Sequence, residues 1–262
     1  MERKKIGIAL SGGGARGFAH VGVLKALAEN GIPIDFIAGT SVGSFVGGAF
    51  AAGLSPDEII KIGRGVGWSG FTGFAFSHRG LLTNRPIAKF IERHFPVHRF
   101  EDLAIPFAAV ACELRNGAEI IYRNTGDLGF AIRASCAVPG VFTPLIDPQG
   151  RMIVDGGVVS PLPVLAARAM GADIVIAVDL LACGSTPSRV PSTIFGAVLR
   201  SAMTLLQSAS RGEHYAAEMV IAPKIAHIGQ EQLSKFDETI ALGEEAVSER
   251  IDEILSLSRT AE

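Results

Sequence analysis

Residues 34–52, IDFIAGTSVGSFVGGAFAA, join a short apolar run to a series of small residues. The run has the length and composition of a buried strand, and the small residues that follow are typical of a helix. At the junction, the pentapeptide GTSVG (39–43) places Ser41 in a sharp turn, where a Cβ at Gly39 or Gly43 would crowd the chain. This nucleophile-elbow pattern predicts an acyl-transfer serine. The same residues also fit an ordinary strand-to-helix turn in which the serine caps the helix.

Strand and helix patterns alternate along most of the chain, and this alternation predicts a three-layer α/β/α sandwich with a mostly parallel central sheet. Residues 1–262 are expected to form one domain, with a motif-bearing part at 5–180 and a C-terminal helical part at 190–258 packed on it. The expected strands are 5–10, 34–38, 107–113, 119–123, 152–155 and 173–179. The expected helices are 18–29, 42–52, one that starts at 55, 87–94, 128–136, 162–170, 194–215 and 238–257.

The composition describes a compact globular protein, since 48% of the residues are hydrophobic and 19% are charged. A net charge of −2 and the lack of a lysine or arginine run give no electrostatic case for nucleic acid or anionic lipid. Three widely spaced cysteines indicate neither a disulfide framework nor a zinc site. The start, MERKKIGIAL, predicts a first strand rather than a signal peptide, and no window has the length of a membrane span. A cytoplasmic location is expected.

A glycine-rich loop, SGGGARG (11–17), follows the first strand and opens the first helix. Its unshielded N–H groups and the positive end of the helix favour a negative charge, either a phosphate or the oxyanion of an acyl transfer. The phosphate alternative has support, because Gly12, Gly14 and Gly17 fit the dinucleotide fingerprint. That fingerprint also requires an acidic residue at the far end of the second strand, whereas Asp35 lies at its beginning. A Walker A loop is excluded because the loop has no Gly-Lys-Ser/Thr.

A serine nucleophile needs a base, and the leading candidate is Asp155. The apolar strand 152–154 ends on this carboxylate, and Gly156 and Gly157 let the chain turn away at once. In a parallel sheet, strands that end at the same edge bring such residues together. An ordinary aspartate is a weak base, so the mechanism requires burial to raise its proton affinity. The alternative is an aspartate that caps a helix.

A Ser-Asp-His triad is the alternative to a serine and aspartate alone, and the chain has six histidines. His20 lies inside the first helix and is expected to be packed and hydrogen-bonded, whereas His94 and His98 are expected at the surface. His214 and His227 follow the serine in the order of an α/β-hydrolase. That fold has several strands before its nucleophile, and here only two are expected. The triad is therefore disfavoured.

Four sequence blocks, taken together, resemble the patatin-like phospholipase family in its bacterial form. The blocks are the loop 12–17, the pentapeptide 39–43, Ala134-Ser135-x-x-x-Pro139 and Asp155-Gly156-Gly157. They lie in order within about the first 160 residues, no motif position is substituted, and the expected layers agree with the family fold. Residues beyond about 180 match no motif of the family.

The resemblance implies a catalytic dyad in which Ser41 is the nucleophile and Asp155 the general base, with no metal or organic cofactor. The loop is then expected to supply the oxyanion hole, and its arginine either touches substrate or braces the loop. The Ala134 to Pro139 block is expected to shape the floor of the site. The implied oxyanion-hole residues are Gly12, Gly13, Gly14 and Ala15. The supporting motif positions are Arg16, Gly17, Gly39, Gly43, Pro139, Gly156 and Gly157.

The implied substrate is an acyl ester or a (lyso)phospholipid, with no role for nucleic acid. The aromatic segment 67–76 is a candidate lid or peripheral membrane contact, and a loop folded over the core is the alternative. Apolar residues at 194, 195, 198, 199, 202 and 206 recur at helical spacing, which favours a helix face docked on the sheet. One alternative is a regulatory or scaffold protein that keeps the fold with little turnover. A second, disfavoured by the position of Asp35, is a nucleotide-binding oxidoreductase. The sequence does not indicate the oligomeric state.

Overall fold

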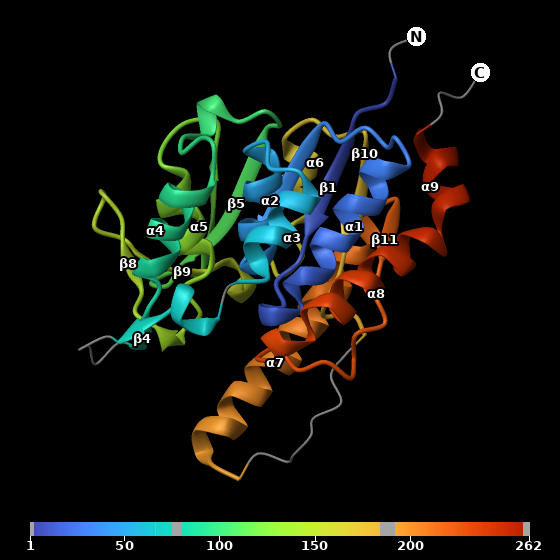
Figure 1. Ribbon diagram of the computed structural model, residues 1–262. Helices are drawn as coiled ribbons and strands as arrows, with labels where there is room; N and C mark the ends of the chain where they lie inside the picture. Colours follow the sequence, from blue (N-terminus) through green and yellow to red (C-terminus); the bar gives the residue numbers. More distant parts are fainter. Residues whose placement is uncertain (1–2, 66, 75–79, 184–191, 259–262) are drawn as a thin grey trace.

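The computed structural model describes residues 3–65, 67–74, 80–183 and 192–258 (Figure 1). Two expectations fall partly outside these residues. In the segment 67–76, the only aromatic side chain among the described ones is that of Phe71; those of Trp68, Phe74 and Phe76 lie outside the description. In the apolar helical pattern that begins at 194, the side chains of Phe195 and Leu199 are likewise outside the description.

A mostly parallel sheet forms the centre of the protein, as the sequence predicts. Its strands are, in spatial order, β11 (Met219–Ile221), β10 (Ile174–Val178), β1 (Ile6–Leu10), β2 (Phe36–Thr40), β5 (Phe107–Glu113), β9 (Met152–Asp155) and β8 (Leu145–Ile146), with β6 (Ala118–Arg123) paired to β5. The pairings from β11 to β5 are parallel. In contrast, β6 and β9 run antiparallel to β5, and β8 runs antiparallel to β9.

Helices cover both faces of this sheet, which gives the three expected layers (Figure 1). Neighbouring residues of a strand point to opposite faces. Ile8 of β1 therefore lies in the core beneath the first helix, whereas Ala9 packs with Val164 on the other side. Because both faces are covered, the strand is apolar throughout. The helices are α1 (Phe18–Glu29), α2 (Val42–Ala51), α3 (Pro56–Gly63), α4 (Arg85–His94), α5 (Leu128–Ser135), α6 (Val164–Ala169), α7 (Ile194–Glu213), α8 (Phe236–Ser248) and α9 (Ile251–Ser258).

A second, three-stranded sheet was not expected from the sequence. It contains β3 (Gly73–Phe74), β4 (Gly80–Thr83) and β7 (Gly140–Phe142), in the order β3-β4-β7. The strands are only two to four residues long, and β7 lies some 60 residues after β4, so no local pattern identifies the sheet. This sheet lies beside α4 and α5, at the end of the molecule opposite α9 (Figure 1).

The C-terminal helices differ from the expectation in two ways. The single helix expected at 238–257 is wrong, because a turn at Glu249 and Arg250 separates α8 from α9. α8 packs on α1, where Lys25 pairs with Glu244 at 2.9 Å. The expectation that the apolar face of 194–206 docks on the sheet is also wrong for Ile194 and Val198, which are exposed on the part of α7 that projects from the body of the protein (Figure 1), whereas Leu206 lies against Gly157.

Candidate active site

Ser41 occupies the turn between β2 and α2 with φ 54° and ψ −125°, a conformation that costs a non-glycine residue about 1–3 kcal/mol. The flanking glycines are required, as predicted. A Cβ on Gly39 would lie 2.4 Å from the carbonyl oxygen of Gly43, and one on Gly43 would lie 2.2 Å from the carbonyl oxygen of Leu10. The Ser41 hydroxyl makes no capping hydrogen bond to α2, so its part in the turn is not that of an N-cap side chain.

Ser135 at the end of α5 holds this turn in place. Its buried Oγ accepts a hydrogen bond from the Ser41 N–H at 2.9 Å and donates one to the carbonyl oxygen of Val110 at 2.6 Å. The hydroxyl thereby fixes the backbone of Ser41 relative to β5. Within the Ala134 to Pro139 block, Ser135 contacts the backbone of Ser41, whereas Pro139 is exposed in the turn that leads into β7; the role of the block as the floor of the site stays a prediction.

Replacing Ser135 with alanine is expected to lower the free energy of unfolding by about 1–3 kcal/mol, because two main-chain groups lose their partner. It is also expected to lower kcat for a soluble short-chain ester more than it raises KM, because the Ser41 backbone is released. Thermal unfolding and steady-state kinetics measure both effects. Ser210→Ala is the matched control, since it removes an equally buried hydroxyl that bonds to Asp179 instead. An equal loss of kcat in both variants would contradict a positioning role for Ser135.

The order of strands around β5 brings Asp155 to Ser41. β6 pairs along one edge of β5, so β2 and β9 must share the other edge. They meet end to end, because Thr40 pairs with Val110 and Asp155 pairs with the next residue, Ala111. Successive residues of a strand rise by about 3.3 Å. The parallel arrangement expected for β9 is therefore wrong, and the carboxylate arrives from the opposite direction.

The Asp155 carboxylate is buried and only half satisfied. Oδ1 accepts a hydrogen bond from the Gly157 N–H at 2.7 Å, which is the capping role considered from the sequence. Oδ2 is buried without a hydrogen-bond partner among the described residues. Burial raises the pKa of Asp155 to about 6, although the nearby Ser41 hydroxyl and the Gly157 N–H each lower it in part. A carboxylate in this condition is a stronger base than an exposed one.

The glycine-rich loop lies beside Ser41, since a Cβ on Gly12 would be 3.5 Å from that of Ser41. Its amides are not equivalent. The Gly12 N–H donates to the carbonyl oxygen of Pro161 at 3.0 Å, and the Ala15 N–H donates to that of Gln230 at 2.7 Å. The N–H groups of Gly13 and Gly14 donate to no described residue. The predicted oxyanion hole stays a prediction, and the two central glycines are its best candidates.

Arg16 connects the glycine-rich loop to the segments that follow β10 and β11. Its side chain is fully buried and donates to the carbonyl oxygens of Ile228 at 2.7 Å, Ala226 at 3.3 Å and Leu180 at 3.4 Å. Burial also lowers the pKa of this guanidinium. These contacts tie the loop to the segment after β11, so the structure supports bracing over substrate contact.

Ser41 opens onto an apolar cavity of about 290 Å³. Rings of Phe45, Phe71 and Phe90 pack on one another along its wall, at centroid distances of 5.4 to 5.5 Å. For the one described aromatic side chain of 67–76, this packing favours a cavity wall over a solvent-exposed flap. The residues that line the cavity include Gly14, Ala15, Gly17, Val42, Ala49, Leu82, Phe95, Cys136, Val138, Val141 and Phe142.

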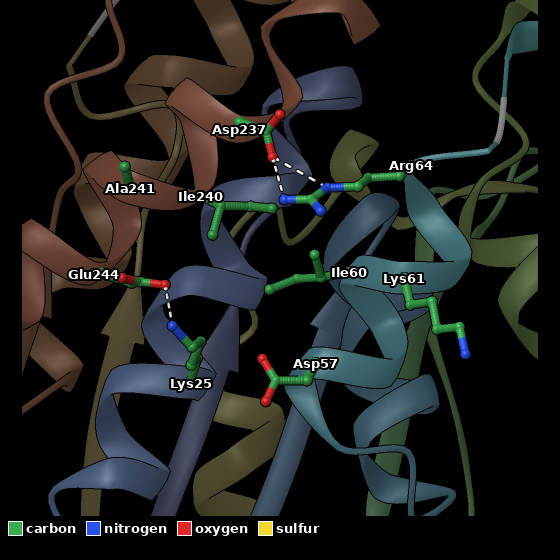
Figure 2. Close-up of a pocket in the computed structure, with 9 residues that line it drawn as sticks. All are labelled: Lys25, Asp57, Ile60, Lys61, Arg64, Asp237, Ile240, Ala241 and Glu244. Atoms are coloured by element: carbon green, nitrogen blue, oxygen red, sulfur yellow. Dashed lines mark hydrogen bonds and ion pairs between the residues drawn. The ribbon is translucent and has the colours of Figure 1, made fainter.

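A larger cleft of about 480 Å³ lies elsewhere, between α1, α3 and α8 (Figure 2). Its charges are largely paired with one another: Lys25 points to Glu244, and Arg64 points to Asp237 (Figure 2). None of the described residues that line it is a serine, cysteine or histidine. Size therefore does not identify the candidate active site. The side chains favour the smaller, apolar cavity, because Ser41 lies in its wall.

Among the five described histidines, none makes a hydrogen bond to Ser41 or Asp155, and the sixth, His78, lies outside the described residues. His20 is buried, as predicted, and its Nε2 lies 2.8 Å from the carbonyl oxygen of Ser11; burial lowers its pKa to about 4. His214 pairs with the buried Asp179 at 2.7 Å, at the end of β10. His227 pairs with Glu238 at 2.7 Å. His98 is exposed as expected, and His94 is half-buried against Phe90.

The dinucleotide alternative gains no support from Asp35. This carboxylate pairs with Arg3 at 2.6 Å and accepts a hydrogen bond from the Ile6 N–H at 2.7 Å. These contacts lie where β1 and β2 begin, whereas the glycine-rich loop lies where β1 ends. Arg3 and the Ile6 N–H together lower the pKa of Asp35, with the bond to Arg3 as the larger cause.

Comparison with known protein families now adds to this geometry. Residues 8–168 match the family model described as patatin-like phospholipase, which covers more than half of the chain and includes Ser41, Asp155 and the glycine-rich loop. The chain belongs to the patatin-like phospholipase family. The resemblance inferred from the four sequence blocks is thereby confirmed.

Relatives within the patatin-like phospholipase family come from animals, fungi and bacteria. A patatin-like phospholipase domain-containing protein of Caenorhabditis elegans is 37% identical over 186 residues, 67% of this chain and 13% of that protein. Lysophospholipase NTE1 of Kluyveromyces lactis is 37% identical over 200 residues, 73% and 13% of the two chains. An uncharacterized NTE family protein of Mycobacterium tuberculosis is 37% identical over 188 residues, 71% and 51%. The chain therefore matches between about an eighth and a half of these relatives.

A solved structure supports the fold independently. VipD from Legionella pneumophila superposes with a TM-score of 0.65 over 98% of this chain and 67% of that one, at 14% sequence identity. Identity this low supports the fold alone. Across the described residues, none of the helices combines the length and apolar character needed to cross a bilayer.

Two groups near the site were missed by sequence reasoning. Glu213 of α7 bonds to the Ser160 hydroxyl at 3.1 Å and the Val164 N–H at 3.3 Å, and burial raises its pKa to about 7. Ser160 in turn accepts a hydrogen bond on its carbonyl oxygen from the Thr40 hydroxyl at 2.8 Å, beside Ser41. No motif contains either residue, and only the tertiary fold brings α7 to this loop.

Proposed function

We propose that this protein is a serine lipid acyl hydrolase that acts through a Ser41–Asp155 dyad. One observation carries the proposal: a strained serine lies at an apolar cavity beside a buried carboxylate that has one unpartnered oxygen. Backbone strain at the serine, burial of an ionised carboxylate and an unsatisfied carboxylate oxygen each cost stability. Such costs are concentrated at functional sites. Membership of the patatin-like phospholipase family supports the same chemistry.

In the proposed reaction, Oδ2 of Asp155 accepts the Ser41 proton as Oγ forms a bond to the ester carbonyl carbon. The carbonyl electrons move to oxygen, where the Gly13 and Gly14 N–H groups stabilise the oxyanion. When the carbon–oxygen bond to the alcohol breaks, Asp155 returns its proton to the leaving alkoxide. A water molecule then attacks the acyl-enzyme, with the same carboxylate as base, and releases the fatty acid and free Ser41.

The cavity supports a long-chain acyl substrate. Its described lining is almost entirely aliphatic and aromatic, so an acyl chain gains about 0.8 kcal/mol per methylene that it buries there. A polar headgroup finds no matching groups in the cavity and would remain outside it. The name of the K. lactis relative, a lysophospholipase, supports a lysophospholipid as the first substrate to test.

Replacing Val141 with phenylalanine is expected to shorten the acyl chain that the site accepts. Val141 lies on β7 at the cavity wall and is half-buried, so the larger side chain occupies space meant for substrate. We expect kcat/KM to fall by about tenfold or more for long-chain esters, because a tenfold loss corresponds to about two methylenes that the cavity no longer buries. For acetyl or butyryl esters we expect little change. Leu165→Phe, at an exposed position of α6, is the control. Equal losses for all chain lengths would contradict an acyl-binding role for the cavity.

The proposed function itself is tested by assaying the purified protein on lysophosphatidylcholine, long-chain esters and short-chain esters. Hydrolysis of at least one acyl ester that requires both Ser41 and Asp155 is the expected result. A folded protein that hydrolyses none of them would instead support the regulatory or scaffold alternative.

A further inference from the structure

The projecting helix α7 carries a narrow apolar stripe that nothing in the described structure covers. Ile194, Val198 and Leu205 are 87%, 63% and 71% exposed. At about 100° per residue, these three positions fall within an arc of about 40°. Burial of large aliphatic side chains away from water is favourable, so their exposure is unfavourable to the protein on its own. A stripe of three along one helix therefore indicates a surface that is covered in use.

The charges of α7 favour a lipid surface over a second copy of the chain. Arg200 and Arg211 are the only charged residues of the helix before Glu213, its last residue. Two copies of this helix laid against each other would bring like charges together. The phosphate groups of a lipid headgroup layer carry the complementary charge, while the stripe contacts the acyl chains. α7 is too polar to cross a bilayer, so it would lie along the surface.

The base of α7 is fixed to the strands and loops around the site. Besides the Glu213 contacts to Ser160 and Val164, Asp179 at the end of β10 bonds to both Ser210 and His214. The loop that Glu213 holds also accepts the hydrogen bond of the Gly12 N–H, through Pro161. Because of these contacts, the helix has a defined orientation relative to Ser41.

The apolar stripe and the proposed active site lie at the same end of the molecule. Leu206 of α7 packs against Gly157, two residues after Asp155. The neighbouring Val158 is 48% exposed, and Leu81 of β4, next to the cavity residue Leu82, is 67% exposed. Figure 1 shows α7 projecting past this edge of the sheet, on the side where β4 also lies. One flat lipid surface can therefore contact several elements around the cavity.

We propose that α7 docks on the surface of a phospholipid membrane or micelle through Ile194, Val198 and Leu205, and so presents lipid to the cavity at Ser41. Docking of α7 does not need turnover. Only the presentation of lipid to the cavity rests on the proposed function. Docking lowers the cost of moving an acyl ester from the lipid phase into the apolar cavity. Hydrolysis of aggregated lipid then depends on the stripe, whereas hydrolysis of a soluble ester does not.

Vesicle flotation of the Ser41→Ala protein tests docking apart from catalysis. The probe is a vesicle of phosphatidylcholine and phosphatidylglycerol. Adding Ile194→Ser, Val198→Ser and Leu205→Ser to this background is expected to lower the bound fraction by about tenfold or more. The single variants Val198→Ser and Leu165→Ser form a matched pair, because these side chains are 63% and 62% exposed. We expect only the first to weaken binding. Circular dichroism and thermal unfolding check that every variant is folded.

In the active Ser41 background, the triple variant is expected to lose hydrolysis of vesicle lipid and to keep hydrolysis of a butyryl ester. Vesicle binding that is unchanged in the folded triple variant overturns the proposal. So does a concentration-dependent dimer in sedimentation that the triple variant abolishes, combined with no vesicle binding by either protein, because α7 would then be an interface between copies. If the wild-type protein binds vesicles through the stripe but hydrolyses no ester, the result counts against the Ser41–Asp155 dyad and leaves the docking proposal supported.

Discussion

Replacing Ser41 with alanine is expected to reduce acyl ester hydrolysis by up to about 10⁶-fold in kcat, the size of loss seen when the nucleophile is removed from a serine protease. The substitution removes the only atom that can form the acyl-enzyme and leaves the turn intact, since alanine fits wherever serine does. Steady-state kinetics on a soluble ester measure the loss. Covalent labelling of wild type, but not of Ser41→Ala, by a fluorophosphonate identifies the nucleophile directly.

His214→Ala is the control for this prediction. His214 bonds to Asp179 at the end of β10, and its loss is expected to weaken that contact without a comparable loss of turnover. A variant that loses activity as completely as Ser41→Ala would revive the triad that the sequence left as an alternative. Retention of full activity by Ser41→Ala would remove the basis of the proposed function.

Replacing Asp155 with asparagine is expected to abolish hydrolysis and, at neutral pH, to stabilise the fold. Asparagine keeps an oxygen for the Gly157 N–H and cannot accept the serine proton. The pKa of Asp155 is about 6 in the folded protein and 3.8 as an ordinary aspartate, so holding it ionised at pH 7 costs the fold up to about 3 kcal/mol. The variant is therefore expected to gain about 1–3 kcal/mol in free energy of unfolding above pH 6.

The effect of Asp155 on folding stability and on activity changes with pH in a defined direction. Asp155 binds a proton more tightly in the folded state, so its cost to stability is full above pH 6 and disappears as the pH falls toward 4. The stability advantage of Asp155→Asn should shrink over the same range, as chemical denaturation at several pH values can measure. Wild-type kcat/KM should fall as the pH drops through about 6, because the protonated carboxyl is not a base. Unchanged activity at pH 5, or a variant less stable at pH 7, would contradict the assignment.

Local sequence patterns were sufficient for the parts of the fold that local chemistry determines. The turn at Ser41 follows from two glycines and a change of period, and the buried strands follow from unbroken apolar runs. The family follows from four motifs in order. Patterns of this kind depend on a few adjacent residues, so they can be read without tertiary structure.

What the sequence could not provide depends on contacts between distant segments. The direction of β9 depends on how it pairs with β5, and nothing in the residues Met152–Asp155 distinguishes the two directions. The apolar spacing in α7 identified an amphipathic helix and could not say what lies against it. The Ser135 contact to Ser41 joins residues 94 positions apart. The choice of Gly13 and Gly14 among the loop amides depends on acceptors at Pro161 and Gln230.

The end-to-end meeting of β2 and β9 on one edge of β5 has a consequence for tolerance to change. Thr40, which precedes Ser41, and Asp155 pair with consecutive residues of β5, so a shift of that strand moves Ser41 and Asp155 together. For the proposed enzyme, substitutions that reshape the outer strands or the helical layers can alter which lipid is accepted while the distance between Ser41 and Asp155 is preserved. In the proposed enzyme, the preferred substrate can therefore change through substitutions that leave the arrangement of Ser41 and Asp155 intact.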